Sequence, residues 1–522
     1  MLCYNGGVNP RSIRHMSRSQ MRSLGPDLRP RVSRLRVLGD GAHALGELLL
    51  VLGAAMCLPA LVALWYGEIA ELEAFGGAAV AVALLGWWLE RSFPQKHMSW
   101  RAALVLCVAG WVLYSLTGGL PVWLSLGIPF VDAAFEATSV FTTTGFTVLT
   151  GIEDLPRSIL LWRVEMQWLG GLGILSFFLL VSFPGGEAFR LLLVEGPKAL
   201  VQRPSPGVRG TILILWRIYI GLTALNFLAL LLLGAGGFNS LAYALSTSST
   251  GGFGLHDANL GQFALAGHPH AYGIELVTIV FMLLSGISFL SHHLLLSGQP
   301  RSTLFGSETR TYWTMLAGTV LLLVVEGYMR TGPNVFSHGE LPRRALFQSA
   351  SLLSGAGLAT TDFRHWLSFP AGLQALLFLM LTGGCVGSTS GGLKILRFRV
   401  LRLYAWHHVK RSTYPRRYVM PFRLGGTLIP EEEVNQMVVV AFCWLALTAL
   451  GGVLTALFSH HGALESITVS LSAVSNMGPS LLTPTHLAAF PTALKAYYIV
   501  AMLAGRLEIL PVLALFSRRV WQ

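Results

Sequence analysis

Four short loops that end in glycine recur along the chain, and loops of this composition can present backbone carbonyls to a cation. The final glycines stand at positions 145, 252, 357 and 478, so neighbouring glycines are 107, 105 and 121 residues apart. Each loop follows a short apolar run and precedes a polar loop and a long apolar segment. Such a spacing is typical of a repeat unit. Four such loops around one axis would bring backbone carbonyls together to replace the water around a cation.

We name these segments the glycine loops and expect them to form an ion path. The residues predicted to line it are Thr143, Thr144, Gly145, Thr250, Gly251, Gly252, Gly355, Ala356, Gly357, Asn476, Met477 and Gly478. Thirteen residues before each final glycine stand Asp132, Asn239, Arg344 and Glu465. Three of these can accept hydrogen bonds at the start of a short helix, and the opposite, negative helix ends would favour a dehydrated cation. Arg344 departs from this pattern and is expected at the outer surface.

A glycine-rich segment interrupts an apolar run further along, and we name it the glycine-rich break. Its small and polar residues are Gly383, Gly384, Gly387, Ser388, Thr389, Ser390, Gly391 and Gly392. So much glycine and hydroxyl cannot hold a helix at membrane depth, where irregular backbone is tolerated only beside a watery cavity or packed in protein. Lys394, Arg397 and Arg399 follow directly and place the break near the cytoplasmic end. The break is therefore predicted to obstruct the pore below the glycine loops and to move.

One arginine lies inside the last apolar run. Arg506 stands in the sequence Gly505-Arg506-Leu507-Glu508. A charge inside a spanning helix costs about 2.5–3.5 kcal/mol on insertion scales, so it usually faces a cavity or a partner. Two interpretations remain open. Arg506 faces the pore and repels cations locally, or it pairs with Glu508 or another acid between helices.

The elements that must position these residues are membrane helices. Hydrophobic residues make up 53% of the 522 residues and charged residues 12%, and the mean hydropathy is +0.60. Soluble domains carry about 25% charged residues. The net charge of +12 lies almost wholly in alternate loops, as the positive-inside rule requires, so no nucleic-acid partner is expected.

The apolar runs predict an all-α polytopic membrane protein with about ten transmembrane helices and four re-entrant pore loops in pseudo-fourfold helix–pore-loop–helix repeats. The spanning runs are 42–63, 73–89, 102–118, 158–183, 211–234, 272–296, 312–329, 367–393, 434–458 and 491–517. Four shorter runs, too short to span, lie at 132–141, 239–248, 344–353 and 465–474.

The distribution of Lys and Arg predicts that both termini are cytoplasmic and that all four glycine loops open to the outside. The expected organisation is a disordered basic cytosolic tail (1–41), an N-terminal helix pair (42–101), pore repeat 1 (102–200), pore repeat 2 (201–300), pore repeat 3 with the glycine-rich break and a basic linker (301–425), and pore repeat 4 (426–522). The basic linker from Lys394 to Arg423 could bind anionic membrane lipids or a partner ring, or simply be solvated.

Taken together, these motifs resemble the Trk/Ktr/HKT superfamily, and most of all the membrane subunit of bacterial Trk-type potassium uptake systems. The likeness covers roughly residues 40–520 and rests on the glycine loops, the run Trp168–Gly173, the run Gly387–Gly392 and the tail Gly505–Glu508. It implies a helix pair followed by four helix–pore-loop–helix units around one permeation path. It also implies a homodimer with one pore in each subunit and a cytosolic nucleotide-binding ring as regulator.

By matching position, the four final glycines resemble those that accompany potassium preference in this family. The resemblance places K⁺ at Thr144, Gly145, Gly251, Gly252, Ala356, Gly357, Met477 and Gly478. The glycine-rich break resembles a gating loop, and Arg506 resembles the pore arginine. The implied function is potassium uptake across the bacterial inner membrane, with no cofactor. Two departures stand out: the third loop lacks the usual threonine, and Met477 and Ser480 vary the fourth.

Two other classes of protein have sequence requirements that this chain meets only in part or not at all. A sodium- or proton-coupled cation symporter of the same superfamily would need carboxylates in the middle of spans, where Glu165 and Glu508 are the main candidates. An enzyme within the membrane would need a Ser–Lys pair, paired aspartates or a metal-ligand set at depth, and the sequence contains none.

Overall fold

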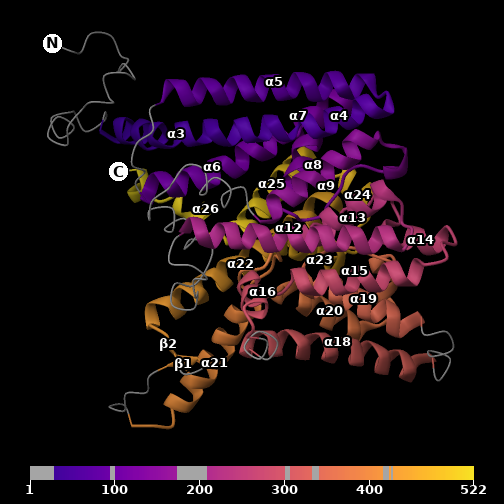
Figure 1. Cartoon of the computed structure of the whole chain (residues 1–522). Helices are drawn as coiled ribbons and strands as arrows, with labels where there is room; N and C mark the ends of the chain where they lie inside the picture. The colour runs from indigo at the N-terminus through magenta and orange to yellow at the C-terminus, as the bar shows by residue number, and fades with distance from the viewer. Residues whose placement is uncertain are drawn as a thin grey trace.

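The chain folds into long helices that lie side by side (Figure 1). The computed structural model describes residues 29–93, 100–172, 208–299, 306–331, 340–415, 422–424 and 427–521. The helices of the first half are α3 (Arg29–Ala55), α4 (Cys57–Tyr66), α5 (Ile69–Ser92), α6 (Trp100–Gly118), α7 (Leu120–Leu126), α8 (Phe130–Phe141), α9 (Arg157–Gly171), α12 (Val208–Leu232) and α13 (Gly237–Ser249).

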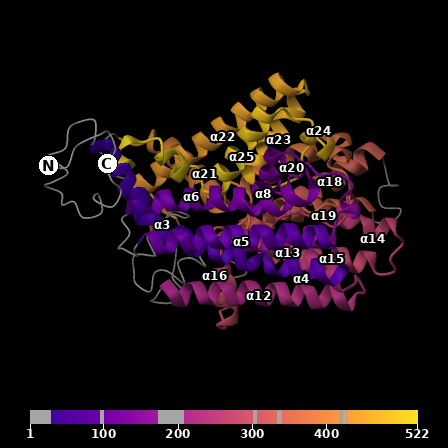
Figure 2. The ribbon, with the colours of Figure 1, turned by 90° about the horizontal axis from the view of Figure 1, so that it is seen from above.

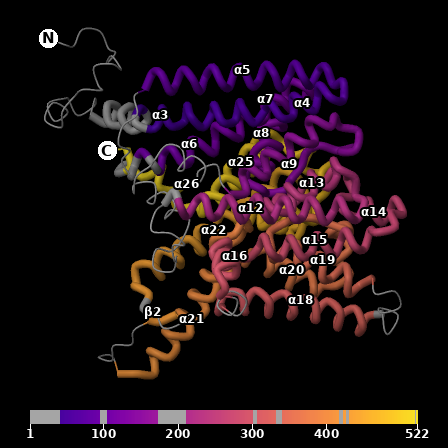
Figure 3. Tube along the Cα trace, viewed as in Figure 1, coloured from indigo at the N-terminus to yellow at the C-terminus, as the bar shows by residue number. Residues whose placement is uncertain are grey.

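The second half continues in the same way, as the trace in Figure 3 shows. Its helices are α14 (Gln262–Leu265), α15 (Ala271–Ser285), α16 (Phe289–Leu296), α18 (Ser307–Thr331), α19 (Glu340–Ser354), α20 (Pro370–Thr382), α21 (Ile395–Arg411), α22 (Glu431–Ser459), α23 (Ala463–Ser475), α24 (Pro484–Ala488), α25 (Thr492–Arg506) and α26 (Leu510–Ala514). Short 3₁₀ turns η1 (Ile152–Asp154), η2 (Asn259–Gly261), η4 (Phe363–Ser368) and η5 (Arg518–Trp521) complete the helical elements.

Six stretches of the described residues are long and apolar enough to cross a membrane. They are Gly41–Tyr66, Ile69–Ser92, Leu104–Leu126, Gly210–Leu232, Ser307–Arg330 and Glu431–Ser459. The first joins α3 to α4 through a turn at Met56, which Pro59 explains because it has no N–H to bond the preceding turn. The helical class and its membrane character are thus confirmed, while the count of ten spans stays a prediction.

The remaining predicted spans are shorter than expected because their helices end or bend. Helix α15 passes into α16 through a bend of 98° at Gly286–Ser288, so the span predicted over 272–296 consists of two helices with a sharp bend between them. Helix α25 ends at Arg506, and Glu508 and Ile509 have positive φ before Pro511 opens α26, so the span over 491–517 is also broken. Part of the predicted span 158–183 lies outside the described residues.

The four short apolar runs do form helices. They are α8, α13, α19 and α23, and each begins two to four residues earlier than the predicted apolar run. Each of these helices is largely buried along its C-terminal half. Each also stops directly before a glycine loop, so all four helices deliver a glycine loop to the interior.

The short helices and the broken helices pack on each other in a closed order. Figure 2 views the same helices after a turn of 90° about the horizontal axis. Helix α9 packs on α13, α15 on α19, α20 on α23, and α25 returns to α8. Ion pairs join two of these contacts: Lys495 of α25 to Asp132 of α8 at 2.5 Å, and Arg343 of α19 to Glu275 of α15. The last repeat therefore closes on the first.

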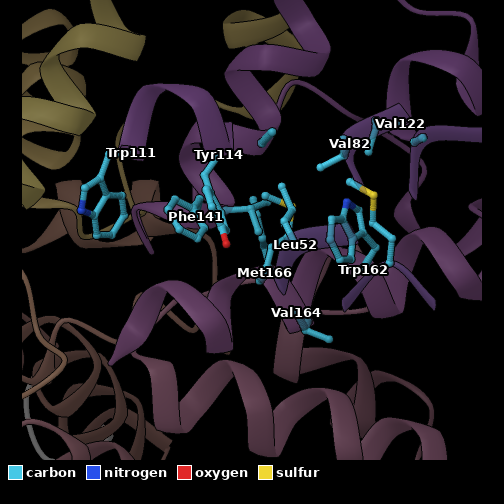
Figure 4. Packing of buried hydrophobic residues seen from close by; sticks show 14 of the residues in the cluster. Leu52, Val82, Trp111, Tyr114, Val122, Phe141, Trp162, Val164 and Met166 are labelled. Carbon is cyan, nitrogen blue, oxygen red and sulfur yellow. The ribbon is translucent and has the colours of Figure 1, made fainter. Parts of the chain in front are cut away.

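The N-terminal helices support the first glycine loop through a buried apolar cluster (Figure 4). Phe141, the last residue of α8, stacks its ring on Tyr114 and packs at a tilt against Trp111, with ring centres 5.2 and 4.5 Å apart. Trp162 of α9 donates its indole N–H to the carbonyl of Gly118 at 2.9 Å. Helix α6 thus fixes both the end of α8 and the side of α9.

Two segments expected to be irregular are helical. Helix α3 begins at Arg29, so the predicted disordered tail of 1–41 is wrong over its last thirteen residues, because a helix already nucleated by the following apolar run extends readily. Helix α21 occupies most of the basic linker, which has no glycine or proline between Ile395 and Arg411. Strands β1 (Arg423–Leu424) and β2 (Thr427–Leu428) then form a small antiparallel hairpin.

The glycine loops and the glycine-rich break as a candidate ion path

All four short helices end in the same backbone hydrogen-bond pattern. In the first, the N–H of Thr143 donates to the carbonyl of Val140 at 3.0 Å, and the N–H of Thr144 donates to Ser139 at 2.8 Å. The corresponding pairs of bonds follow α13, α19 and α23, with distances of 2.8–3.3 Å: Thr250 to Thr247, Gly251 to Ser246, Gly355 to Leu352, Ala356 to Ser351, Asn476 to Ala473, and Met477 to Ser472. This is the Schellman arrangement, which turns the chain out of a helix through one left-handed residue.

The left-handed residue explains a departure noted in the sequence. Its φ is 55° at Thr143, 55° at Thr250, 75° at Gly355 and 53° at Asn476. Glycine and asparagine adopt this conformation readily, whereas a β-branched threonine does so only under strain of about 1–2 kcal/mol. Gly355, which stands in the third loop where the first two loops have threonine, therefore meets the backbone requirement of this position.

The final glycine of each loop is left-handed as well, with φ of 84°, 83°, 70° and 93° in chain order. A Cβ at Gly145 would lie 2.8 Å from the carbonyl oxygen of Gly251, and one at Gly252 would lie 2.9 Å from that of Ala356. A Cβ at Gly357 would collide with the carbonyl oxygen of Met477, and one at Gly478 would lie 2.9 Å from that of Thr144. Each glycine therefore meets the next loop, and the four loops close into one ring.

Side chains behind the ring hold individual loops. Asn476 Nδ2 donates to Thr144 Oγ1 at 2.8 Å and so links the fourth loop to the first. Asn259 Nδ2 donates to the carbonyl of Gly252 at 2.9 Å. Gln167 Nε2 donates to the carbonyl of Gly251 at 2.6 Å. The contacts of Asn476 and Gln167 join residues far apart in the chain, and nothing in the sequence pattern predicted any of the three.

A buried ion pair supports the first loop alone. Glu136 of α8 and Arg163 of α9 approach to 2.8 Å, with side chains 1% and 2% exposed. Glu136 also accepts from the N–H of Val148 at 3.1 Å, and the Arg163 guanidinium lies 4.2 Å from the ring centre of Phe253. A glutamate inside the otherwise apolar run before the loop was the sequence signal for this pair.

The glycine-rich break lies directly against the ends of the short helices and the third glycine loop. Thr389 Oγ1 donates to the carbonyl of Ser248 at 3.2 Å, and the N–H of Gly392 donates to that of Ser475 at 2.8 Å. A Cβ at Gly355 would lie 2.6 Å from Ser390 Oγ. The N–H of Cys385 also donates to the carbonyl of Gly286 at 2.9 Å. The break is thus wedged between two glycine-loop helices and the bend of α15.

Arg506 donates hydrogen bonds to three backbone carbonyls. Its guanidinium donates to the carbonyl of Thr389 at 2.8 Å, and to Gly170 and Gly171 at 2.9 and 2.7 Å. Glu508 instead pairs with Arg397, so the pairing of Arg506 with Glu508 is wrong. The last carbonyls of α9 have no helical partner, which makes that helix end a natural site for a cation. Arg506 thereby ties the glycine-rich break to α9.

The residues thirteen positions before each glycine behave differently from one another. Glu465 accepts from the N–H of Gly462 at 3.0 Å, as predicted for a helix start. Asp132 is instead bound by Lys495, and Arg344 pairs with Glu340 at 2.6 Å, partly exposed. These contacts serve packing between helices as much as helix capping.

Carboxylates on the loops that follow the glycine loops bind protein groups. The N–H of Asp257 donates to Glu153 at 3.0 Å, and this bond lowers the pKa of Glu153 from its ordinary value. Asp257 in turn accepts from the N–H groups of Gly151 and Ile152 at 3.0 and 3.2 Å. The side chain of Arg364 lowers the pKa of Asp362 by hydrogen bonding. Glu153 and Asp257 thus join the loops that follow the first and second glycine loops, and the lowered pKa values keep Glu153 and Asp362 charged at neutral pH.

Comparison with known proteins gives one consistent result. A family model described as TrkH, cation transport protein, matches residues 74–522. The Trk system potassium uptake protein TrkH of Vibrio parahaemolyticus is 31% identical over 506 residues, which cover 91% of this chain and 98% of that protein. The Trk system potassium uptake protein TrkG of Escherichia coli is 28% identical, covering 94% of this chain and 99% of that protein.

A solved structure agrees with these sequence relatives. The crystal structure of the potassium transporter TrkH from Vibrio parahaemolyticus aligns with a TM-score of 0.80 at 29% identity, covering 94% of this chain and all of that one. The family model and the relatives extend over the four glycine loops, the glycine-rich break and Arg506 alike. The chain therefore belongs to the TrkH family of cation transport proteins.

Proposed function

We propose that this protein takes up potassium through a channel-like pore whose selectivity filter is the ring of four glycine loops. The observation that carries the proposal is the closed order of approach, in which each final glycine meets a carbonyl of the next loop. Backbone carbonyls arranged around an axis can replace the hydration shell of K⁺. Glycine at these positions permits both the left-handed backbone and the close approach. The names of the relatives, potassium uptake proteins, support potassium as the ion.

The glycine-rich break serves in this proposal as the gate below the filter. It contains three glycines with positive φ, at 383, 387 and 392, and the hydroxyl of Thr389 donates to the carbonyl of Ser248 at the end of α13. Arg506 bonds the break to α9 and places a positive charge beside it. A polar, glycine-rich segment held by a few hydrogen bonds can leave its position at modest free-energy cost. We therefore assign Arg506 to holding the break in place, with its charge directed at the pore.

The surrounding assignments belong to the same proposal. The glycine loops act as re-entrant pore loops, and their positions define the four pore repeats that come after the basic tail and the helix pair. We place the protein in the bacterial inner membrane with both termini in the cytosol, as a homodimer regulated by a cytosolic nucleotide-binding ring. The described chain begins and ends on one side of the bundle, where α3 contacts η5, and this supports termini on a common side (Figure 1).

The exposed basic residues of α21 suit anionic membrane lipids.

A sodium- or proton-coupled symporter is the second candidate function, and one residue favours it. Glu165 is buried within α9, and its Oε2 has no hydrogen-bond partner among the described residues. A buried carboxyl without a cation is expected to be protonated and could carry a proton. Glu508, the other carboxylate considered for this role, is taken by Arg397.

The test is cation uptake by bacterial cells that lack their own potassium uptake systems and carry this gene. We expect the cells to grow at low external potassium and to accumulate K⁺ in strong preference to Na⁺. The Glu165→Gln variant separates the two candidates, because it should leave potassium uptake intact in a simple pore and abolish coupling in a proton symporter. Equal uptake of Na⁺ and K⁺ by the wild type would contradict a potassium-selective filter.

A further inference from the structure

Gly251 is a glycine whose backbone does not require one. It occupies the position before the final glycine, where the other loops carry Thr144, Ala356 and Met477. The φ of Gly251 is not positive, unlike that of Gly252, so conformational freedom does not explain the residue. Space does: a Cβ at Gly251 would lie 2.5 Å from Gln167 Oε1 and 2.7 Å from Gln167 Nε2. The side chain of Gln167 therefore fills the place that a side chain occupies in the other three loops.

Gln167 also bonds to the ring itself. Its Nε2 donates to the carbonyl oxygen of Gly251 at 2.6 Å, and the side chain is fully buried. That oxygen is the one that faces Gly145 across the boundary between the first and second loops. The equivalent oxygens of Thr144, Ala356 and Met477 accept no hydrogen bond from the described residues. Among the four carbonyls at this position, one is therefore held by a side chain and three are not.

The neighbouring repeat identifies the residue that corresponds to Gln167. A Cβ at Gly171 would lie 2.6 Å from Tyr219 Oη and 2.9 Å from Ser249, and a Cβ at Gly286 would meet Tyr312 Oη and Ser354 at nearly the same distances. The two glycines are therefore equivalent. Four residues before each stand Gln167 and Met282, and Met282 lies in the buried cluster that contains Ala356. A methionine cannot donate a hydrogen bond. The second loop therefore receives a hydrogen bond from Gln167 of α9, whereas the third loop receives none from Met282 of α15.

We propose that Gln167 is a specificity-determining residue that acts by positioning the Gly251 carbonyl; the inference rests on the proposed filter. A carbonyl with a short hydrogen bond from behind is restrained in direction and cannot turn freely inward. A smaller ion such as Na⁺ needs its ligands closer than K⁺ does, so a restrained carbonyl disfavours it. Gln167 contributes volume and a donor together, and the two contributions can be separated by substitution.

The experiment compares variants by the ratio of K⁺ to Na⁺ flux in vesicles and by thermal stability in detergent. Gln167→Met removes the donor and keeps the side chain's length, and Met282→Leu is the matched control behind the third loop. We expect Gln167→Met to lower the flux ratio by about three- to tenfold, the range expected for loss of one net hydrogen bond, with little change in stability. Met282→Leu should leave the ratio unchanged. If the flux ratio fell only in proportion to the loss of stability, and did so in both variants, Gln167 would act through packing alone and the inference would be overturned.

A second pair of variants tests the volume contribution. Gly251→Ala alone should lower stability, because its methyl group collides with Gln167. Adding Gln167→Ala to Gly251→Ala should restore part of that stability without restoring the flux ratio. Recovery of both properties would overturn a role for the donor, and this pair remains informative even if Gln167→Met folds poorly.

Gly357→Ser separates failure of this inference from failure of the filter itself, since a Cβ at Gly357 meets Met477 and Gly252 and not Gln167. If Gly357→Ser lowers the flux ratio and Gln167→Met does not, the filter stands and the role of Gln167 is refuted. If neither variant changes the ratio, the filter assignment is wrong and the inference falls with it.

Discussion

The glycine loops and the helix breaks beneath them are adjacent layers built on different plans. All four glycine loops share two left-handed positions, the same pair of helix-ending hydrogen bonds and the same approach to the next loop. The helix breaks differ from one another. Helix α9 ends at Gly171, α15 bends by 98°, α20 is followed by the glycine-rich break, and α25 ends at Arg506.

This difference matches what each layer is proposed to do. A ring of carbonyls around one ion needs four nearly equal contributions, so the backbone pattern recurs although the side chains vary. A gate needs one segment that moves and others that stay, and among the described residues the break after α20 is the one rich in glycine. Even within the ring, the supports differ: Glu136, Tyr243, Gln348 and Val469 occupy the same position nine residues before the final glycines.

The largest expected effect comes from removing a support that only the first loop has. Glu136→Ala leaves Arg163 buried with its charge unpaired, and this should lower the free energy of unfolding by about 3–5 kcal/mol. Glu340→Ala breaks the partly exposed pair with Arg344 and should cost less than about 1 kcal/mol. Denaturation of both variants in the same detergent measures the difference. Similar losses in the two variants would show that the buried pair is not the brace of the first loop.

An intermediate effect is expected in the lower layer. Arg506→Gln removes the charge and weakens the bonds that hold Thr389 to α9, so cation flux in vesicles should rise several-fold while the K⁺ to Na⁺ ratio changes little. Lys495→Met, in the same helix, breaks the pair with Asp132 and should lower stability without raising flux. If Arg506→Gln lost stability and gained no flux, the arginine would be a helix-packing residue only.

The smallest effect is expected at the outer loops. Glu153→Gln weakens the hydrogen bond from Asp257 and should lower the free energy of unfolding by less than about 0.5 kcal/mol at neutral pH. Because folding lowers the pKa of Glu153, its contribution is present above the ordinary carboxyl pKa and is lost as the pH falls through the lowered pKa. Wild type and variant should therefore converge in acid. A gap that widened on acidification would refute this assignment.

The sequence predicted the upper layer better than the lower one, for physical reasons. Short apolar runs that end in glycine are local signals, so α8, α13, α19 and α23 could be placed within a few residues. The bend after Ser285 has no such signal, because Gly286-Ile287-Ser288 is compatible with a continuing apolar helix. The carbonyl partners of Arg506 and Gln167 could not be predicted either, since a backbone carbonyl leaves no trace in residue type and each contact spans more than eighty positions.

The most direct test of the central claim is the K⁺ to Na⁺ flux ratio of four purified variants in vesicles: Gly145→Ser, Gly252→Ser, Gly357→Ser and Gly478→Ser. Each serine places a Cβ against the neighbouring loop and forces a left-handed φ on a residue that resists it. If the four glycine loops form one potassium filter, the ratio should fall in all four variants. An unchanged ratio in all four folded variants would contradict the filter, and a fall in one alone would contradict the ring.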